Sequence, residues 1–209
     1  MPGHGDAAGP FTLPRAVESV RATVDEAGGT SHVVGISGGA VVALLTYLKH
    51  AAQVSSLVLS GGLARAPRWF ALQRAVARIT PEPLLARMLE RSYSGKRPEY
   101  KQAPGEDFRR CGQGTNMAGL AELSRLDLRA QLSRIAVSTL VLCGSDDRAN
   151  VPLSKELATG MPLAELRIVP GATHPWNLQH PVVFNNTVAA FTGRVVSALE
   201  SSGGGRRAR

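Results

Sequence analysis

Short runs of apolar residues alternate with longer amphipathic stretches along most of the chain. Short apolar runs bounded by turn residues are typical of buried strands, whereas apolar residues three and four apart are typical of helices. We expect strands at 32–36, 54–59, 139–143 and 165–169, and helices at 13–27, 38–48, 152–159 and 182–199. The repeated alternation of strand and helix predicts an α/β fold in which helices flank a parallel sheet.

The alternation of strands and helices is interrupted between positions 63 and 135. Helical patterns fall within this segment near 69–79, 83–93 and 106–126. We therefore expect a helical insertion at 63–135 within an α/β core made of 1–62 and 136–200. The final segment, 201–209, contains only Ser, Gly, Ala and Arg, which predicts a disordered basic tail.

A serine stands at the junction of a predicted strand and a predicted helix, in the segment Gly35-Ile36-Ser37-Gly38-Gly39. A sharp strand-to-helix turn of this form exposes the serine hydroxyl and strains its backbone. Glycine suits both Gly35 and Gly39, because side chains there would collide with neighbouring backbone. The helix start also directs N–H groups and the positive end of its dipole toward the serine. This context favours Ser37 as a nucleophile over a purely structural turn.

Two further predicted strands end in loops that carry the other groups needed for catalysis by serine. The third predicted strand is followed by Asp146 and Asp147, and the fourth is followed by His174. The C-terminal ends of parallel strands meet at one edge of a sheet, so these loops should lie near Ser37. A serine nucleophile needs a base within hydrogen-bond reach and an acid that orients the base. We therefore predict a Ser-His-Asp arrangement in which either aspartate supplies the acid.

On these motifs the chain resembles the α/β-hydrolase superfamily, in particular the small bacterial enol-lactonases, esterases and cofactor-free haloperoxidases. The resemblance runs from Pro2-Gly3-His4-Gly5 to about Val196, and the chain order serine, acid, histidine is the order that this superfamily uses. It implies that the acid is Asp147, which stands three residues past Gly144. It also implies that the insertion at 63–135 forms a lid over the active site.

The resemblance implies a serine hydrolase that cleaves a small ester, lactone or related acyl substrate. In such an enzyme Ser37 attacks the carbonyl, His174 takes and returns the proton, and Asp147 orients His174. The backbone N–H of Gly38 stabilises the oxyanion. Perhydrolysis and C–C bond hydrolysis use the same residues in this superfamily, so the motifs do not separate these reactions.

The sequence also departs from the pattern of the superfamily. The usual domain begins with further strands and a His-Gly loop that supplies a second oxyanion-hole N–H, and this sequence has no counterpart to them. We therefore expect an N-terminally incomplete fold in which the strand before Ser37 forms an apolar sheet edge that favours self-association. The alternative to an active hydrolase is a catalytically impaired hydrolase, or a small-molecule-binding module without turnover.

Apolar side chains near the predicted catalytic residues are candidates for the wall of a substrate pocket. Ile36 precedes the serine, Trp69 and Met117 lie in the predicted lid, and Trp176 follows His174 by two positions. We expect these four side chains to contact substrate, with packing between lid and core as the alternative for each.

Composition and charge argue against nucleic-acid binding, metal binding and a disulfide framework. With 209 residues, 44% of them apolar, the chain can bury a sizeable core. The formal net charge is +8, but part of it lies in the segment 201–209, and no RNA-stacking motif or basic recognition helix is present. Two cysteines do not make a disulfide framework, and no cluster of possible ligands has metal-site spacing. We therefore expect no nucleic-acid partner, no metal and no cofactor.

Features of membrane or secreted proteins are weak in this sequence. The apolar stretches are shorter than the roughly 20 residues that a membrane span requires. No charged segment followed by an apolar one begins the chain, so no signal peptide is predicted. We expect a cytoplasmic protein with a small-molecule acyl substrate and no membrane partner.

Overall fold

The computed structural model describes residues 1–92 and 102–204. Its centre is a sheet of four parallel strands in the order β1 (Ser31–Ile36), β2 (Val54–Ser60), β3 (Thr139–Gly144) and β4 (Ala164–Val169). Ile36 pairs with Ser60, and Ser60 pairs with Leu142, so the carboxyl ends of β1, β2 and β3 lie at the same edge of the sheet. The predicted α/β fold with a parallel sheet is confirmed.

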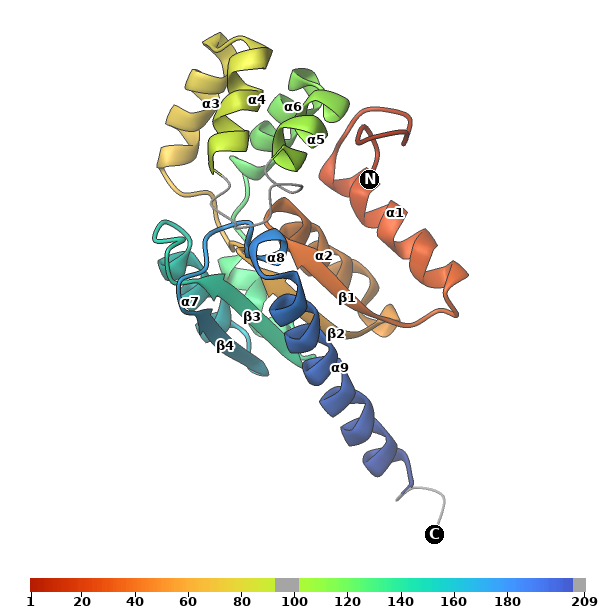
Figure 1. The fold of residues 1–209 in the computed structure, drawn as a ribbon. Helices are drawn as coiled ribbons and strands as arrows, with labels where there is room; N and C mark the ends of the chain where they lie inside the picture. The colour runs from red at the N-terminus through yellow and green to blue at the C-terminus, as the bar shows by residue number, and fades with distance from the viewer. Residues whose placement is uncertain (93–101, 205–209) are drawn as a thin grey trace.

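Helices cover both faces of the sheet (Figure 1). On one face lie α2 (Gly38–His50) and α7 (Val151–Gly160), with α1 (Leu13–Glu26) packed against α2. On the other face lie α8 (Trp176–Gln179) and α9 (Pro181–Gly204). Two 3₁₀ helices, η1 (Ala51–Gln53) and η3 (Arg129–Arg134), precede β2 and β3. Alternate residues of each central strand therefore enter two separate apolar cores, because successive side chains point to opposite faces.

A cluster of charged side chains joins α1 to α2 on the surface. Glu18 of α1 accepts hydrogen bonds from Lys49 and His50 of α2, at 2.5 and 3.2 Å, and from Arg21 of its own helix at 2.9 Å. These bonds, the one from Lys49 above all, lower the pKa of the Glu18 carboxyl to about 2. The carboxylate of Glu18 therefore stays ionised over most of the acid range and links the two helices.

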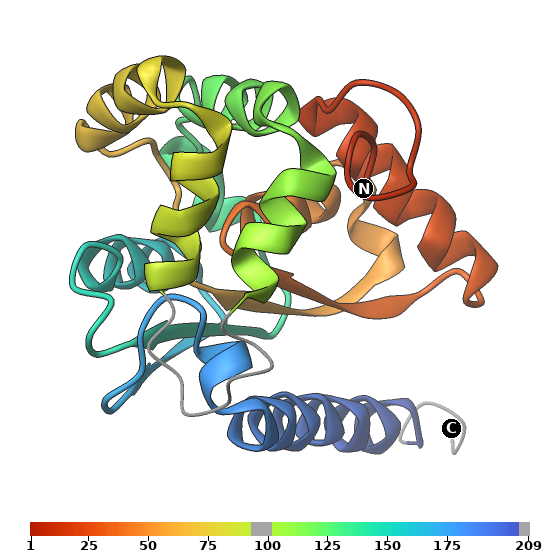
Figure 2. The same cartoon turned by 45° about the horizontal axis from the view of Figure 1, so that its top comes forward.

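The segment between β2 and β3 forms a helical layer above the carboxyl ends of the strands (Figure 2). Its described part contains α3 (Trp69–Ile79), α4 (Glu82–Ser92), α5 (Ala103–Cys111) and α6 (Gln113–Leu123). The prediction of one helix over 106–126 is wrong. The helix is interrupted at Gly112, whose φ of +79° lies in the left-handed region that favours glycine. Helix α5 therefore ends before Gly112, and α6 begins after it.

The C-terminal helix α9 is the one helix in the described part of the chain that is long and apolar enough to cross a membrane by length and composition. Its buried side chains Phe184, Phe191 and Val195 pack against Val58 and Leu140 of the sheet. These three side chains therefore cover one face of the sheet, although only 22% of the apolar window of α9 is buried. Helix α9 also includes residues 201–204, which we expected in the disordered tail, and residues 205–209 lie outside the described residues.

Strand β1 lies at one end of the sheet. Within the described residues it pairs with β2 on one side only, and the side chain of Val34 is 43% exposed. The exposed backbone and apolar side chains agree with the sheet edge expected at this strand. Self-association through this edge stays a prediction.

Candidate active site

Ser37 occupies a sharp turn between β1 and α2. Its φ of +55° and ψ of −120° make it the one non-glycine residue with a positive φ in the described part of the chain. Its backbone N–H donates to the carbonyl oxygen of Ser60 at 2.8 Å, which ties the turn to the end of β2. A Cβ at Gly35 would lie 2.3 Å from the carbonyl oxygen of Gly39, whereas a Cβ at Gly39 would meet nothing within 4 Å. The close packing therefore requires glycine at Gly35, and the same expectation for Gly39 is wrong.

His174 and Asp147 form a hydrogen-bonded pair. The Nδ1 atom of His174 lies 2.7 Å from Oδ2 of Asp147, whose side chain is only 9% exposed. A carboxylate accepts the Nδ1–H of the imidazole, so Nε2 is left as the basic nitrogen. Asp146 makes hydrogen bonds with other residues instead. Its Oδ1 accepts from the hydroxyl of Ser145, and its backbone N–H donates to the carbonyl oxygen of Ala172. Of the two candidate acids, Asp147 is the one in contact with the histidine.

One cavity brings the three predicted catalytic residues together. It has a volume of about 330 Å³, and residues at the carboxyl ends of the strands and residues of α3 and α6 line it. Its lining residues are Ser37, Gly38, Val41, Gly61, Leu63, Trp69, Phe70, Gln73, Leu120, Leu123, Asp147, Ala149, Asn150 and His174. The cavity therefore has a serine hydroxyl, an imidazole and a carboxylate in its wall, with apolar side chains around them.

Asn150 and Gly61 support this pair and were missed by the sequence analysis. The amide Nδ2 of Asn150 donates to both carboxylate oxygens of Asp147, at 2.8 and 3.0 Å, and the side chain is buried. Gly61 has a φ of +60°, and a Cβ there would lie 2.8 Å from Cε1 of His174. One residue therefore holds the carboxylate, and the other leaves room for the imidazole.

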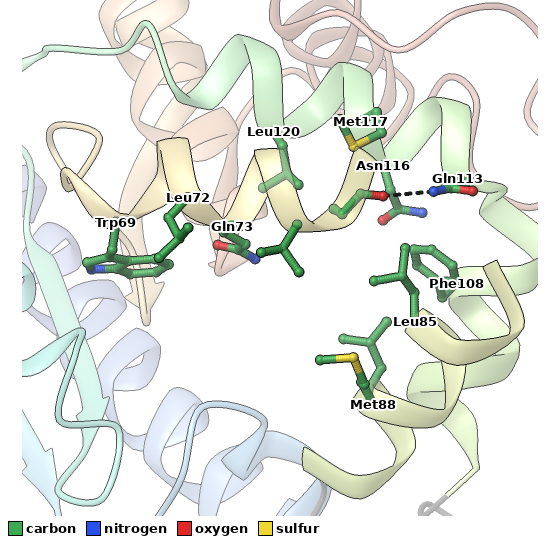
Figure 3. Close-up of a pocket in the computed structure, with 13 residues that line it drawn as sticks. Trp69, Leu72, Gln73, Leu85, Met88, Phe108, Gln113, Asn116, Met117 and Leu120 are labelled. Carbon is green, nitrogen blue, oxygen red and sulfur yellow. Dashed lines mark hydrogen bonds between the residues drawn. The ribbon is translucent and has the colours of Figure 1, made fainter. Parts of the chain in front are cut away.

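The four predicted substrate-binding side chains have different positions. Trp69 lines both the cavity that holds Ser37 and a second cavity between helices α3, α4, α5 and α6, and Met117 lines the second cavity only (Figure 3). Ile36 is half-buried and packs against the core beneath α9. The prediction for Trp176 is wrong. Its side chain is 1% exposed and lies in the core under α9, where the indole N–H donates to the hydroxyl of Ser60 at 2.9 Å.

Metal-binding side chains do not gather in the described residues. No group of three or more histidine, cysteine, aspartate or glutamate side chains within 1–92 and 102–204 could hold a metal ion. The two cysteines, Cys111 and Cys143, are free thiols, and burial raises the pKa of both. The arrangement at the cavity is therefore one of a hydroxyl, an imidazole and a carboxylate.

Comparison with known proteins agrees with this geometry. A model of the alpha/beta hydrolase family matches residues 1–187, and the chain belongs to this family. Among solved structures, an enol-lactonase from Burkholderia xenovorans LB400 superimposes with a TM-score of 0.79 at 23% identity, over 91% of this chain and 78% of that one. A hydrolase from Pseudomonas aeruginosa superimposes with a TM-score of 0.78 at 25% identity, over 91% of this chain and 77% of that one.

Curated relatives are similarly distant in sequence. A pimeloyl-[acyl-carrier protein] methyl ester esterase from Neisseria meningitidis is 28% identical in an alignment that covers 88% of this chain and 77% of the relative. An AB hydrolase superfamily protein from Gibberella zeae is 28% identical in an alignment that covers 90% of this chain and 66% of the relative. The distant relatives are thus esterases and other hydrolases.

Proposed function

We propose that this chain is a serine hydrolase that cleaves a small ester, lactone or related acyl substrate through Ser37, His174 and Asp147. The observation that carries the proposal is that the strained Ser37 turn and the hydrogen-bonded His174–Asp147 pair line one cavity. Membership of the alpha/beta hydrolase family and the esterases among its relatives support hydrolysis as the reaction.

The proposed reaction has two stages, acylation of Ser37 and hydrolysis of the acyl-serine. The Oγ atom of Ser37 attacks the carbonyl carbon while Nε2 of His174 takes the hydroxyl proton, and the carboxylate of Asp147 stabilises the imidazolium. The bond to the leaving alcohol then breaks, the alcohol takes the proton from His174, and an acyl-serine remains. A water molecule next gives a proton to His174 and attacks the acyl-serine, which releases the carboxylic acid and restores the hydroxyl of Ser37.

The N-terminus of α2 provides electrostatic stabilisation in this scheme. Gly38 is the first residue of the helix and lines the cavity next to Ser37. The N–H groups of the first helical turn lack partners within the helix and lie at the positive end of its dipole. The N–H of Gly38 is therefore the donor that we assign to the oxyanion of the tetrahedral intermediate.

A fluorophosphonate probe, which reacts with activated serines, tests the proposal. We expect mass spectrometry to locate the adduct on Ser37, and we expect Ser37→Ala to lose both labelling and hydrolysis of p-nitrophenyl acetate. Ser197→Ala, at an exposed position of α9, is the control and should change neither. An adduct on another serine that persists in Ser37→Ala would contradict the assignment. Labelling of Ser37 without turnover of any ester would favour the catalytically impaired alternative.

A further inference from the structure

Helices α3, α4, α5 and α6, which we call the lid helices, line a second cavity of about 550 Å³ that is partly open to solvent (Figure 3). Its lining residues are Trp69, Leu72, Gln73, Val76, Ala77, Leu85, Met88, Leu89, Phe108, Gln113, Asn116, Met117 and Leu120. Ten of these 13 side chains are apolar, and none carries a charge. We call this space the lid cavity. An uncharged, apolar wall favours an alkyl or aryl group as its occupant, because burying a charge there would lose hydration without a compensating partner.

Two of the three polar side chains in the lid cavity form hydrogen bonds to the backbone of the surrounding helices. The amide Nε2 of Gln113 donates to the backbone carbonyl oxygens of Ala77 and Thr80, at 2.8 and 3.1 Å, and thereby links the start of α6 to the end of α3. The amide Nδ2 of Asn116 donates to the carbonyl oxygen of Gly112 at 2.9 Å. The NH2 groups of both side-chain amides are therefore engaged, and none of the described residues that line the cavity is a cation that could neutralise a bound carboxylate.

The lid cavity is continuous in its lining with the catalytic cavity. Trp69, Gln73 and Leu120 line both spaces, so the two cavities are direct neighbours on either side of these side chains. We infer that a molecule held at Ser37 extends past them into the lid cavity. His174 lines only the catalytic cavity. Because His174 protonates the leaving alcohol, the alcohol must stay beside the imidazole, and the acyl half is the part of the substrate that can extend into the lid cavity.

We propose that the natural substrate is an ester of an uncharged, unbranched medium-chain acyl group, whose alkyl chain fills the lid cavity while its carbonyl lies at Ser37. This inference rests on the proposed hydrolase function. Apolar side chains of the cavity wall are exposed to solvent, with Leu72 at 67% and Met88 at 50%. An alkyl chain would cover them, so each methylene buried there should raise kcat/KM about 4-fold, the equivalent of about 0.8 kcal/mol.

The test compares p-nitrophenyl acetate, butyrate, hexanoate and octanoate at concentrations where none aggregates. We expect kcat/KM of the wild-type chain to rise about 4-fold for each added methylene that the cavity buries. A total rise of less than about 10-fold from acetate to octanoate, which differ by six methylenes, would contradict the proposal. We also expect an ester whose acyl chain ends in a carboxylate to lose that gain. Ala77→Trp fills the lid cavity at a position that does not line the catalytic one, so it should reduce the octanoate rate and spare acetate. Ala75→Trp, an exposed position of the same helix, is the matched control and should keep the wild-type chain-length profile.

The outcomes separate this inference from the function on which it rests. If Ser37 is labelled and acetate is hydrolysed, but kcat/KM does not depend on chain length, the lid cavity does not hold the acyl group. The same conclusion follows if Ala77→Trp lowers acetate and octanoate turnover equally. If Ser37 reacts with no probe and hydrolyses no ester, the hydrolase proposal itself fails and takes this inference with it.

Discussion

Replacing Gly61 by alanine should displace the imidazole of His174. We expect a large fall in kcat but only a modest fall in the free energy of unfolding. The new Cβ would lie 2.8 Å from Cε1 and 3.0 Å from Nδ1 of the imidazole, whereas ordinary contact begins near 3.4 Å. The ring must therefore retreat by roughly half an ångström, and its bond of 2.7 Å to Asp147 restricts the direction in which it can move. A misplacement of this size at a reacting group costs roughly 10- to 100-fold in rate.

The stability cost has a separate origin. Gly61 has a φ of +60°, and an alanine forced into that left-handed conformation costs about 1–2 kcal/mol. For a chain of this length the loss lowers Tm by roughly 2–8 °C, which leaves the protein folded at assay temperature. The expected signature is therefore a large fall in kcat for p-nitrophenyl acetate at nearly unchanged KM, together with a small shift of the thermal unfolding curve.

Gly171→Ala provides the matched control for this experiment. Gly171 has a similar φ of +66°, but a Cβ there would meet nothing within 4 Å. The control should therefore show the backbone strain as a comparable loss of Tm and keep most of its activity. Wild-type kcat in Gly61→Ala, or an equal loss of kcat in both variants, would refute the reasoning that the space left by Gly61 positions His174.

Three further predictions concern single polar side chains. Asp147→Asn should lower kcat by roughly 10³- to 10⁴-fold because the histidine loses its orienting carboxylate, and Asp146→Asn should leave kcat nearly unchanged; equal losses in ester assays would contradict the assignment. Asn150→Ala removes two hydrogen bonds to the Asp147 carboxylate and should lower kcat by about 10-fold or more at constant KM, so a change in KM alone would argue against a positioning role. Glu18→Gln should destabilise the chain above about pH 4.5, because the pKa of Glu18 is lowered to about 2 on folding. In urea unfolding the gap to wild type should close as the pH falls from about 4.5 toward 2, and a gap that widens there would contradict this.

The parts of the fold that local patterns determine were predictable from the sequence. The four strands and the turn at Ser37 follow from short apolar runs and from glycines at particular positions, and both signals lie within a few residues of one another along the chain. The break between α5 and α6 was missed, because Gly112 lies inside a helical pattern and a single glycine there is tolerated in many helices.

The errors at the candidate site have a different cause, since they depend on contacts between distant segments. Trp176 follows His174 closely, yet the indole N–H finds its partner in the Ser60 hydroxyl within the core under α9. Asn150 stands at the start of α7, where an asparagine commonly caps the helix, but its amide bonds the Asp147 carboxylate instead. A sequence pattern does not specify which of several nearby partners a polar side chain will take.

The two tryptophans of the chain lie in opposite environments, and this contrast makes the protein its own fluorescent reporter. Trp69 is 41% exposed and lines both cavities, whereas Trp176 is 1% exposed beneath α9. The indole of Trp176 bonds the hydroxyl of Ser60, and the carbonyl oxygen of Ser60 accepts the backbone N–H of Ser37. Acrylamide should quench the emission of Trp69 and spare that of Trp176. Entry of an alkyl chain should shift the emission maximum of Trp69 to shorter wavelength. Only unfolding should shift the emission maximum of Trp176 to longer wavelength. Occupancy of the lid and integrity of the core can thus be followed separately in one unlabelled sample.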